Sequence, residues 1–278
     1  MPNRITQAGV AQGEQIHGAD NRKPTIVRNI YLYVAGVMSL SVAGGIISAS
    51  GQEIGGLVFL LGPLLMTILL RTFGGDGWAD TGLRLGPARW HLFGLAIFPV
   101  SFALILGVGV LTGTVTLAGT FRLFLAATAL EVLPRLVFAG FEEVGWRGYL
   151  EPRFVALGVA DVRRHTIVGL IWAVWHIPYI MSTSGYSDLP IALFVPLLMT
   201  GVLVMAFVYG QMRLKSGSVW PVVLAHGMGN ILAYPLIFGD FAVFEKPAII
   251  ATRPESILFI VIWGAITWGL MRRRPQQR

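Results

Sequence analysis

Long apolar segments alternate with short polar ones along almost the whole chain. A helix needs about 20 mostly apolar residues to cross the hydrocarbon core of a bilayer. The pattern therefore predicts an all-α polytopic membrane bundle of about eight transmembrane helices. The predicted spans are Asn29–Ser50, Ile54–Leu70, His91–Leu111, Phe121–Phe141, His165–Ser182, Leu189–Met212, Ser218–Phe238 and Glu255–Met271.

The composition agrees with lipid as the solvent. Of the 278 residues, 55% are hydrophobic and only 13% are charged, whereas soluble domains carry about 25% charged residues. The chain has no cysteine, which excludes disulfides, thiolate zinc sites and cysteine nucleophiles. We expect a polar tail over residues 1–28, one transmembrane domain over 29–271 and a basic tail over 272–278.

The basic residues predict the orientation of the chain. Its net charge is +7, and cytoplasmic loops of membrane proteins are enriched in lysine and arginine. If the N-terminus is cytoplasmic, only Arg122, Lys246 and Arg253 flank the spans on the outside, and sixteen basic residues flank them on the inside. We therefore predict a multi-pass integral membrane protein with both termini in the cytoplasm, and no nucleic-acid partner. The sixteen are Arg22, Lys23, Arg28, Arg71, Arg84, Arg89, Arg147, Arg153, Arg163, Arg164, Arg213, Lys215, Arg272, Arg273, Arg274 and Arg278.

Two adjacent glutamates and an arginine follow the fourth predicted span at its cytoplasmic end. Glu143 and Arg147 are four residues apart, so on a helix they share a face and can form an ion pair. Glu142 points about 100° away, which leaves its carboxylate free to act on a proton. The alternative is a solvated charge pair at a helix end.

A histidine lies inside the fifth span, within the run Trp172-Ala-Val-Trp-His176. Ionisable residues within a bilayer are costly and suggest function. A lone buried histidine usually forms a hydrogen bond with a backbone carbonyl, however, and the neighbouring tryptophans are interpreted as packing.

A second histidine lies in the seventh span, where His226 and Asn230 share a helical face because they are four residues apart. Gly227 and Gly229 would allow another helix to approach this segment closely. The alternative is that the two polar side chains form interhelical hydrogen bonds that only stabilise the bundle.

The three polar groups lie at compatible depths in the predicted membrane. A carboxylate, two imidazoles and an amide together can activate water and bind an oxyanion. We therefore predict that Glu142, His176, His226 and Asn230 converge around one cavity that opens to the cytoplasm.

The order of these motifs carries a resemblance. Glu142-Glu143-x-x-x-Arg147, Trp172-x-x-x-His176 and His226-x-x-x-Asn230 follow one another in three separate spans. In this respect the chain resembles the CPBP family of intramembrane proteases, which includes type II CAAX prenyl endopeptidases and abortive-infection or bacteriocin-immunity proteins. The resemblance covers the motif core, residues 121–230. Trp172 stands where the family often has phenylalanine, a change that we interpret as conservative.

The resemblance implies peptide-bond hydrolysis within or beside the membrane. Glu142 would activate water with His176 as its partner, and His226 and Asn230 would stabilise the oxyanion. Glu143 and Arg147 would shape the site. The implied partners are membrane lipid and a peptide or protein substrate, with a lipidated, CAAX-like peptide as one option.

The resemblance requires no cofactor, although zinc is an option. Glu142, His176 and His226 are of the residue types that ligate zinc. We prefer glutamate-activated water, because Asn230 is a poor zinc ligand and a good oxyanion donor.

Two non-enzymatic functions are the alternatives. Glu131 and Arg135, four residues apart in the fourth span, could belong to the ion path of a transporter or form a buried structural pair. Transporters often carry internal repeats, and we find none in the sequence. A bacteriocin-immunity or scaffold protein of the same family would keep the motifs without catalysis.

Overall fold

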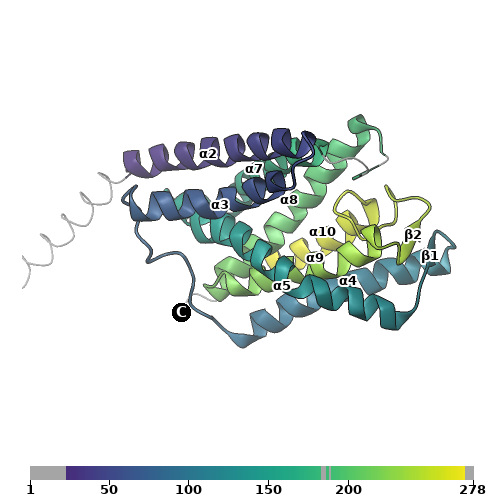
Figure 1. The fold of residues 1–278 in the computed structure, drawn as a ribbon. Helices are drawn as coiled ribbons and strands as arrows, with labels where there is room; N and C mark the ends of the chain where they lie inside the picture. The colour runs from purple at the N-terminus through teal and green to yellow at the C-terminus, as the bar shows by residue number, and fades with distance from the viewer. Residues whose placement is uncertain (1–22, 183–185, 188, 273–278) are drawn as a thin grey trace, which may run out of the picture.

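The computed structural model describes residues 23–182, 186–187 and 189–272, and over these residues the chain forms a bundle of long helices (Figure 1). The predicted all-α polytopic fold is confirmed. The helices are α2 (Lys23–Ala49), α3 (Ile54–Thr72), α4 (Ala88–Leu111), α5 (Phe121–Gly145), the π-helical turn η1 (Trp146–Leu150), α6 (Glu151–Ala156), α7 (Asp161–Ser182), α8 (Ile191–Ser216), α9 (Trp220–Phe238) and α10 (Ile257–Arg272). The strands are β1 (Val115–Leu117) and β2 (Ala242–Phe244).

Each of the eight predicted spans coincides with one long helix. The largest differences are that α2 begins at Lys23, inside the predicted polar tail, and that the helix of the fourth span continues past Phe141 through η1 and α6. Hydropathy marks only the apolar part of a helix, whereas the backbone hydrogen bonds continue into the polar boundary. Residues 1–22 and 273–278 of the predicted tails lie outside the described residues.

The eight long helices differ in how well they suit a bilayer. Six of them, α2, α3, α4, α5 with its continuation, α8 and α9, are long and apolar enough to cross a membrane. The helix α7 has 22 residues but begins with the polar run Asp161–His165, and α10 is apolar with only 16 residues. At 1.5 Å per residue, α10 is about 24 Å long, somewhat shorter than a hydrocarbon core of about 30 Å.

The helices pack in a continuous series. The α2–α3 hairpin packs on α7, α7 on α8, and α8 on α10, while α9 is packed between α4 and α5. Contact between α3 and α5 joins the two halves of the bundle. Every candidate residue lies on α5, η1, α7 or α9, so the site sits where these halves meet.

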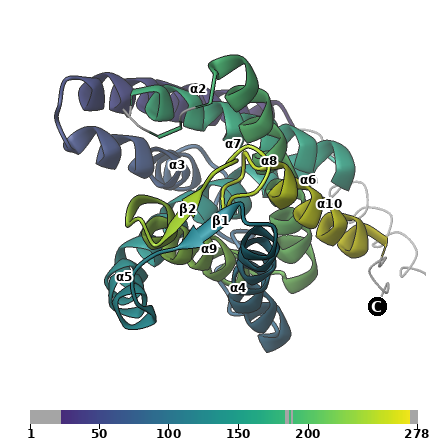
Figure 2. The ribbon, with the colours of Figure 1, turned by 90° about the vertical axis from the view of Figure 1, so that its right-hand side faces the viewer.

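The bundle has two distinct ends. At one end β1 pairs antiparallel with β2, with Val115 opposite Phe244, and the α2–α3 turn and the C-terminal end of α7 lie at this end too (Figure 1). We call it the strand end, and Figure 2 looks onto it. The opposite end holds the start of α2, the 73–87 connection, the α8–α9 turn and the end of α10, and we call it the basic end.

Ion pairs close the basic end. Asp76 accepts hydrogen bonds from Arg153 Nη1 at 2.8 Å and from the Tyr149 hydroxyl at 2.6 Å. Asp80 pairs with Arg71 at 2.7 Å and also with Arg153. This set, with Asn29, which donates to Asp76 at 2.9 Å, is the basic-end network. It fastens the 73–87 connection to α2, α3, η1 and α6.

Close helix approach fixes the position of α9. A Cβ atom at Gly227 would lie 2.6 Å from Leu136 on α5, and one at Gly229 would lie 2.7 Å from Phe98 on α4. A larger residue at either position would force Leu136 or Phe98 to move. The expected close approach at the two glycines is therefore confirmed, and it holds the face of α9 that carries His226.

Candidate active site

The site begins with the charged residues at the end of α5. Glu143 lies in the last turn of α5 and Arg147 lies one turn further on, in η1. Arg147 Nη1 donates to both carboxylate oxygens of Glu143, at 3.0 and 2.9 Å, and neither side chain is exposed. The ion pair expected from their spacing is present.

Two aromatic rings complete the surroundings of Arg147. Its guanidinium carbon lies 4.4 Å from the ring centroid of Trp172 and 5.0 Å from that of Tyr209. The negative face of an aromatic ring attracts a cation, most strongly away from water. Glu143 and the two rings therefore stabilise the buried charge together.

Glu143 also holds His226. The Nδ1 atom of His226 lies 2.8 Å from Glu143 Oε1. An ionised carboxylate only accepts hydrogen bonds, so the proton of this bond belongs to Nδ1. The other ring nitrogen, Nε2, then points toward Glu142 and lies 3.9 Å from its Oε1 atom. One buried carboxylate thereby orients an imidazole toward the second.

Glu142 is held by a neutral donor. Its Oε2 atom accepts a hydrogen bond from the indole Nε1–H of Trp172 at 3.0 Å. Within the described part of the chain, no arginine or lysine forms an ion pair with Glu142. The carboxylate is nearly buried, with 6% of its side chain exposed, and one of its oxygens remains available to a water molecule or a substrate.

His176 has its own fixed orientation. Its Nδ1 atom lies 2.8 Å from the backbone carbonyl oxygen of Trp172. A carbonyl only accepts, so Nδ1 carries the proton and Nε2 is left for another partner. The carbonyl bond expected for a lone buried histidine is present, and it leaves the reactive nitrogen of the ring free.

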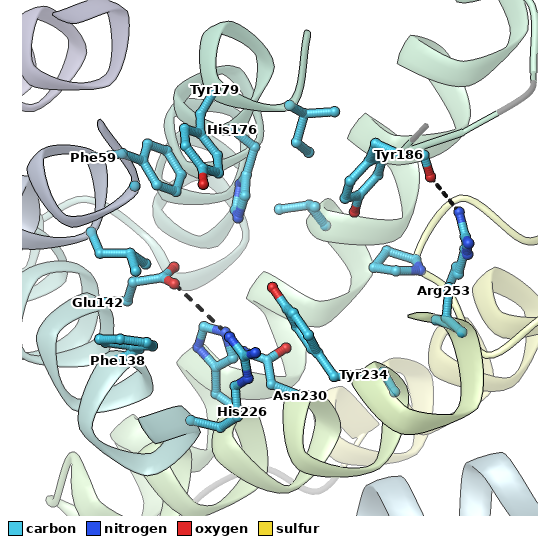
Figure 3. Close-up of a pocket in the computed structure, with 18 of the residues that line it drawn as sticks. Phe59, Phe138, Glu142, His176, Tyr179, Tyr186, His226, Asn230, Tyr234 and Arg253 are labelled. Carbon is cyan, nitrogen blue, oxygen red and sulfur yellow. Dashed lines mark hydrogen bonds and ion pairs between the residues drawn. The ribbon is translucent and has the colours of Figure 1, made fainter. Parts of the chain in front are cut away.

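One cavity of about 540 Å³ brings four of the candidate residues together. Glu142, His176, His226 and Asn230 all line it. Figure 3 shows His226 and Asn230 side by side on α9, His176 on the opposite wall and Glu142 at the side between them. Glu143 and Arg147 are not among the lining residues and support the cavity from the Glu142 side.

The lining of this cavity bears on its predicted opening. It runs from Glu142 and His226 to Glu53, Tyr186 and Arg253, which belong to connections at the strand end. The predicted topology places those connections outside, so the predicted opening to the cytoplasm and the predicted orientation of the chain do not agree with each other. The reason is that η1, α6 and the pair of Glu143 with Arg147 fill the basic side of the site.

The described residues do not provide a set of ligands for zinc. Over the described ranges, no group of three or more histidine, aspartate or glutamate side chains is arranged to hold a metal ion. Glu142, His176 and His226 therefore do not fit a zinc centre in this arrangement.

Trp172 contributes more than the packing inferred from the sequence. Its indole donates to Glu142, its carbonyl accepts from His176, and its ring faces Arg147. The usable signal was its spacing, because a residue four positions before His176 shares the face that points to the site. The change from phenylalanine was treated as conservative, although phenylalanine lacks the N–H group that holds Glu142.

The second charged pair of α5 lies on the cavity wall. Arg135 Nε lies 2.6 Å from Glu131 Oε2, and its guanidinium carbon lies 3.4 Å from the ring centroid of Tyr234. Both charged side chains are partly exposed, at 19% and 29%. The two charges neutralise each other, and Arg135 also packs on the Tyr234 ring, as expected for a structural pair.

Comparison with protein families locates the same part of the chain. Residues 121–232 match the family described as Type II CAAX prenyl endopeptidase Rce1-like. The match agrees with the resemblance found in the motifs. The matched region begins with α5, ends within α9 and contains all six candidate residues. A search of curated proteins gave no match. The Rce1-like match indicates a protease, and the apolar helices indicate an integral membrane protein.

Proposed function

We propose that the protein is an intramembrane endopeptidase that hydrolyses a peptide bond of a membrane-associated substrate. The observation that supports this most is the state of Glu142, a nearly buried carboxylate that faces a cavity and, among the described residues, has no arginine or lysine partner. Ionisable groups kept in an apolar bundle at such a cost usually serve function. The Rce1-like match gives that function its class.

Glu142 is the proposed general base. The Trp172 indole holds Oε2, so Oε1 is the oxygen that would take a proton from water. A positioned base of this kind contributes about 10²–10⁴-fold to the rate. His176 would orient the attacking water by accepting a hydrogen bond at its free Nε2, and the protonated Glu142 would pass the proton to the leaving amine as the peptide bond breaks.

His226 and Asn230 are the proposed oxyanion donors. Both line the cavity from α9, and in its protonated form His226 donates from Nε2. The Glu143 carboxylate fixes the ring at 2.8 Å, so the donor is preorganised before the substrate binds. Preorganised donors in a water-poor site are effective because they need no rearrangement during the reaction.

The proposed substrate is a peptide that is anchored to the membrane. The cavity lies among membrane-length helices, and aromatic side chains such as Phe59, Tyr179 and Tyr234 line it. These surfaces suit an apolar segment or a lipid-modified residue beside the scissile bond. A prenylated CAAX-like peptide is one member of this class, as the description of the matched family suggests.

A non-enzymatic membrane protein is the other candidate. An ion path would need charged groups that are open to a moving ion, whereas Arg135 is already paired with Glu131 and lies against Tyr234. An immunity or scaffold protein would gain nothing from a buried Glu142 that no arginine or lysine neutralises. The two functions therefore make opposite predictions for a change that alters only this carboxylate.

The deciding experiment is cleavage by Glu142→Gln. Fluorogenic peptides anchored by a farnesyl group or by a transmembrane segment would be offered to purified protein in lipid nanodiscs. Glutamine keeps the shape but cannot accept the proton, so cleavage should fall by about 10²–10⁴-fold. The matched control is Glu131→Gln on the same helix, which should cleave like the wild type.

Two results would contradict this proposal. Wild-type-like cleavage by Glu142→Gln would show that Glu142 is not the general base. Complete loss of wild-type cleavage in a chelator, restored by zinc, would assign the same residues to a metal-dependent reaction.

A further inference from the structure

The lining of the cavity differs between its two ends. Towards the basic end its floor is formed by Glu142 and His226, beneath which Glu143, Arg147 and Tyr209 are completely buried. Towards the strand end its lining continues to residues of the connections between helices. In Figure 3 this direction runs from Glu142 on one side to Tyr186 and Arg253 on the other.

Arg253 connects two segments of the chain at the strand-end side of the cavity. Its Nη1 atom donates to the Tyr186 carbonyl at 2.5 Å and lies 3.7 Å from Glu255 Oε1. Burial raises the pKa of the Glu255 carboxyl, and Arg253 opposes this effect. Arg253 thereby joins the segment after α7 to the segment before α10. Polar contacts therefore hold this part of the cavity lining together at the strand end.

The two ends of the bundle differ strongly in basic residues. Only Arg122, Lys246 and Arg253 belong to the strand end, and the described residues place twelve lysines and arginines at the basic end. Lysine and arginine are retained on the cytoplasmic side during membrane insertion. The twelve are Lys23, Arg28, Arg71, Arg84, Arg89, Arg147, Arg153, Arg163, Arg164, Arg213, Lys215 and Arg272.

We propose that the cavity opens to the extracytoplasmic side of the membrane and receives its substrate from there. Charge places the basic end in the cytoplasm, and the lining places the mouth at the opposite end. This inference rests on the proposed protease function for its substrate, and on geometry and charge alone for its direction.

The direction in which the cavity opens narrows the class of possible substrates. A peptide that reaches Glu142 through the strand end must present its scissile bond on, or just beneath, the outer surface of the membrane. The substrate is then the extracytoplasmic juxtamembrane segment of a membrane-anchored protein or peptide. A lipidated C-terminus that stays on the cytoplasmic surface would meet the closed basic end.

Single cysteines test the direction without any substrate. The chain has no cysteine of its own, so each introduced thiol is the only reactive one. Gln52→Cys marks the exposed α2–α3 turn at the strand end, Phe73→Cys marks an exposed position at the basic end, and Ala233→Cys marks the cavity. Ala225→Cys, completely buried on the same helix as Ala233, is the matched control.

The variants would be produced in bacterial cells, which would then be treated with a membrane-impermeant maleimide. Labelling of the cysteines at positions 52 and 233 in intact cells, with labelling at 73 only after lysis, is the expected result. The cysteine at position 225 should react only after denaturation. Labelling at 73 in intact cells, with 52 and 233 protected until lysis, would overturn the proposal. So would labelling at 233 from the same side as 73.

A second arm separates this inference from the protease function. Proteoliposomes would be sorted by whether the cysteine at position 52 is accessible, and a lipid-anchored fluorogenic peptide would be added from outside. Cleavage should occur only in vesicles with the strand end outward. Cleavage only with the basic end outward would overturn the direction. If no peptide is cleaved even in detergent, the protease function fails while the labelling still decides the direction of the cavity.

Discussion

The basic-end network and the cavity cluster, by which we mean Glu142, Glu143, Arg147 and His226, both combine buried carboxylates with arginine but are completed differently. In the basic-end network Asp76 and Asp80 each pair with arginine, and Asp76 accepts a hydroxyl as well. In the cavity cluster Glu143 is paired with Arg147 and His226, whereas neighbouring Glu142 has no cationic side-chain partner except the imidazole 3.9 Å away.

The difference teaches which buried charges are available for chemistry. A carboxylate whose oxygens are all occupied stabilises the fold and can do little else. A carboxylate held on one oxygen and facing a cavity keeps its capacity for a proton. The predictions below test whether this division into structural and reactive charges is correct.

The largest expected effect is on stability, from Glu143→Ala. This change strands the buried Arg147 and releases His226, and removal of one member of a buried pair costs about 3–5 kcal/mol. Glu142→Ala should cost less, because its main polar partner is a neutral indole. Thermal unfolding of the two variants in detergent would compare them. Equal losses would show that the two glutamates do not differ in role.

The next effect is on turnover, from Asn230→Ala. Loss of one oxyanion donor costs on the order of 10²–10³-fold in rate, and the fold should be little affected because Asn230 lines a cavity. Asn29→Ala is the contrasting variant, since Asn29 is completely buried in the basic-end network. It should lower stability and leave cleavage per folded molecule unchanged. The reverse pattern would contradict the comparison.

Asp76→Asn should act on stability alone. Its carboxylate binds Arg153 and Tyr149 and is only 3% exposed, and leaving buried polar partners poorly satisfied costs about 1–3 kcal/mol. Cleavage measured at matched folded concentration should not change. Asp161→Asn is the control, because its ion pair is 45% exposed on the aspartate side and exposed pairs contribute about 0–1 kcal/mol. A catalytic defect in Asp76→Asn would join the two clusters into one functional unit.

The smallest expected effect comes from Trp172→Phe. This change removes the hydrogen bond to Glu142 but keeps an aromatic ring beside Arg147. One hydrogen bond contributes about 0.5–1.5 kcal/mol, so cleavage should fall by up to roughly tenfold. Trp175→Phe is the matched control, since Trp175 stacks on Phe59 and has no polar contact with Glu142 among the described residues. Equal cleavage by the two variants would leave Trp172 as a packing residue.

Much of the fold was predictable because lipid imposes a simple rule on sequence. The ends of α3, such as Ile54, and of α9, such as Phe238, were predicted within two residues because apolar and polar residues change abruptly there. The pair of Glu143 with Arg147 followed from helical spacing. These features depend only on residues that are close together in the sequence.

The remaining features depend on residues far apart in the sequence. The bond of Trp172 with Glu142 joins positions 30 residues apart, and the bond of His226 with Glu143 joins positions 83 residues apart. The direction of the cavity depends on where Glu53, Tyr186 and Arg253 meet, on three separate connections. No local sequence pattern determines contacts between residues so far apart. The sequence therefore predicted that the reactive residues lie together, but not the route by which a substrate reaches them.

The π-helical turn η1 has a consequence for how this segment can change in length. The Glu151 amide bonds to the Trp146 carbonyl five residues earlier, so the turn holds one residue more than an α-helical turn. Deleting a single residue between 148 and 150 would therefore restore an ordinary α-helical turn and leave everything after it in nearly the same orientation relative to α5, because the wider turn absorbs one extra residue. Arg153 would stay on the side of Asp76, and Glu142 would keep its place. Related chains should therefore tolerate the loss of one residue there, whereas longer insertions and deletions should fall in the 73–87 and 239–256 connections.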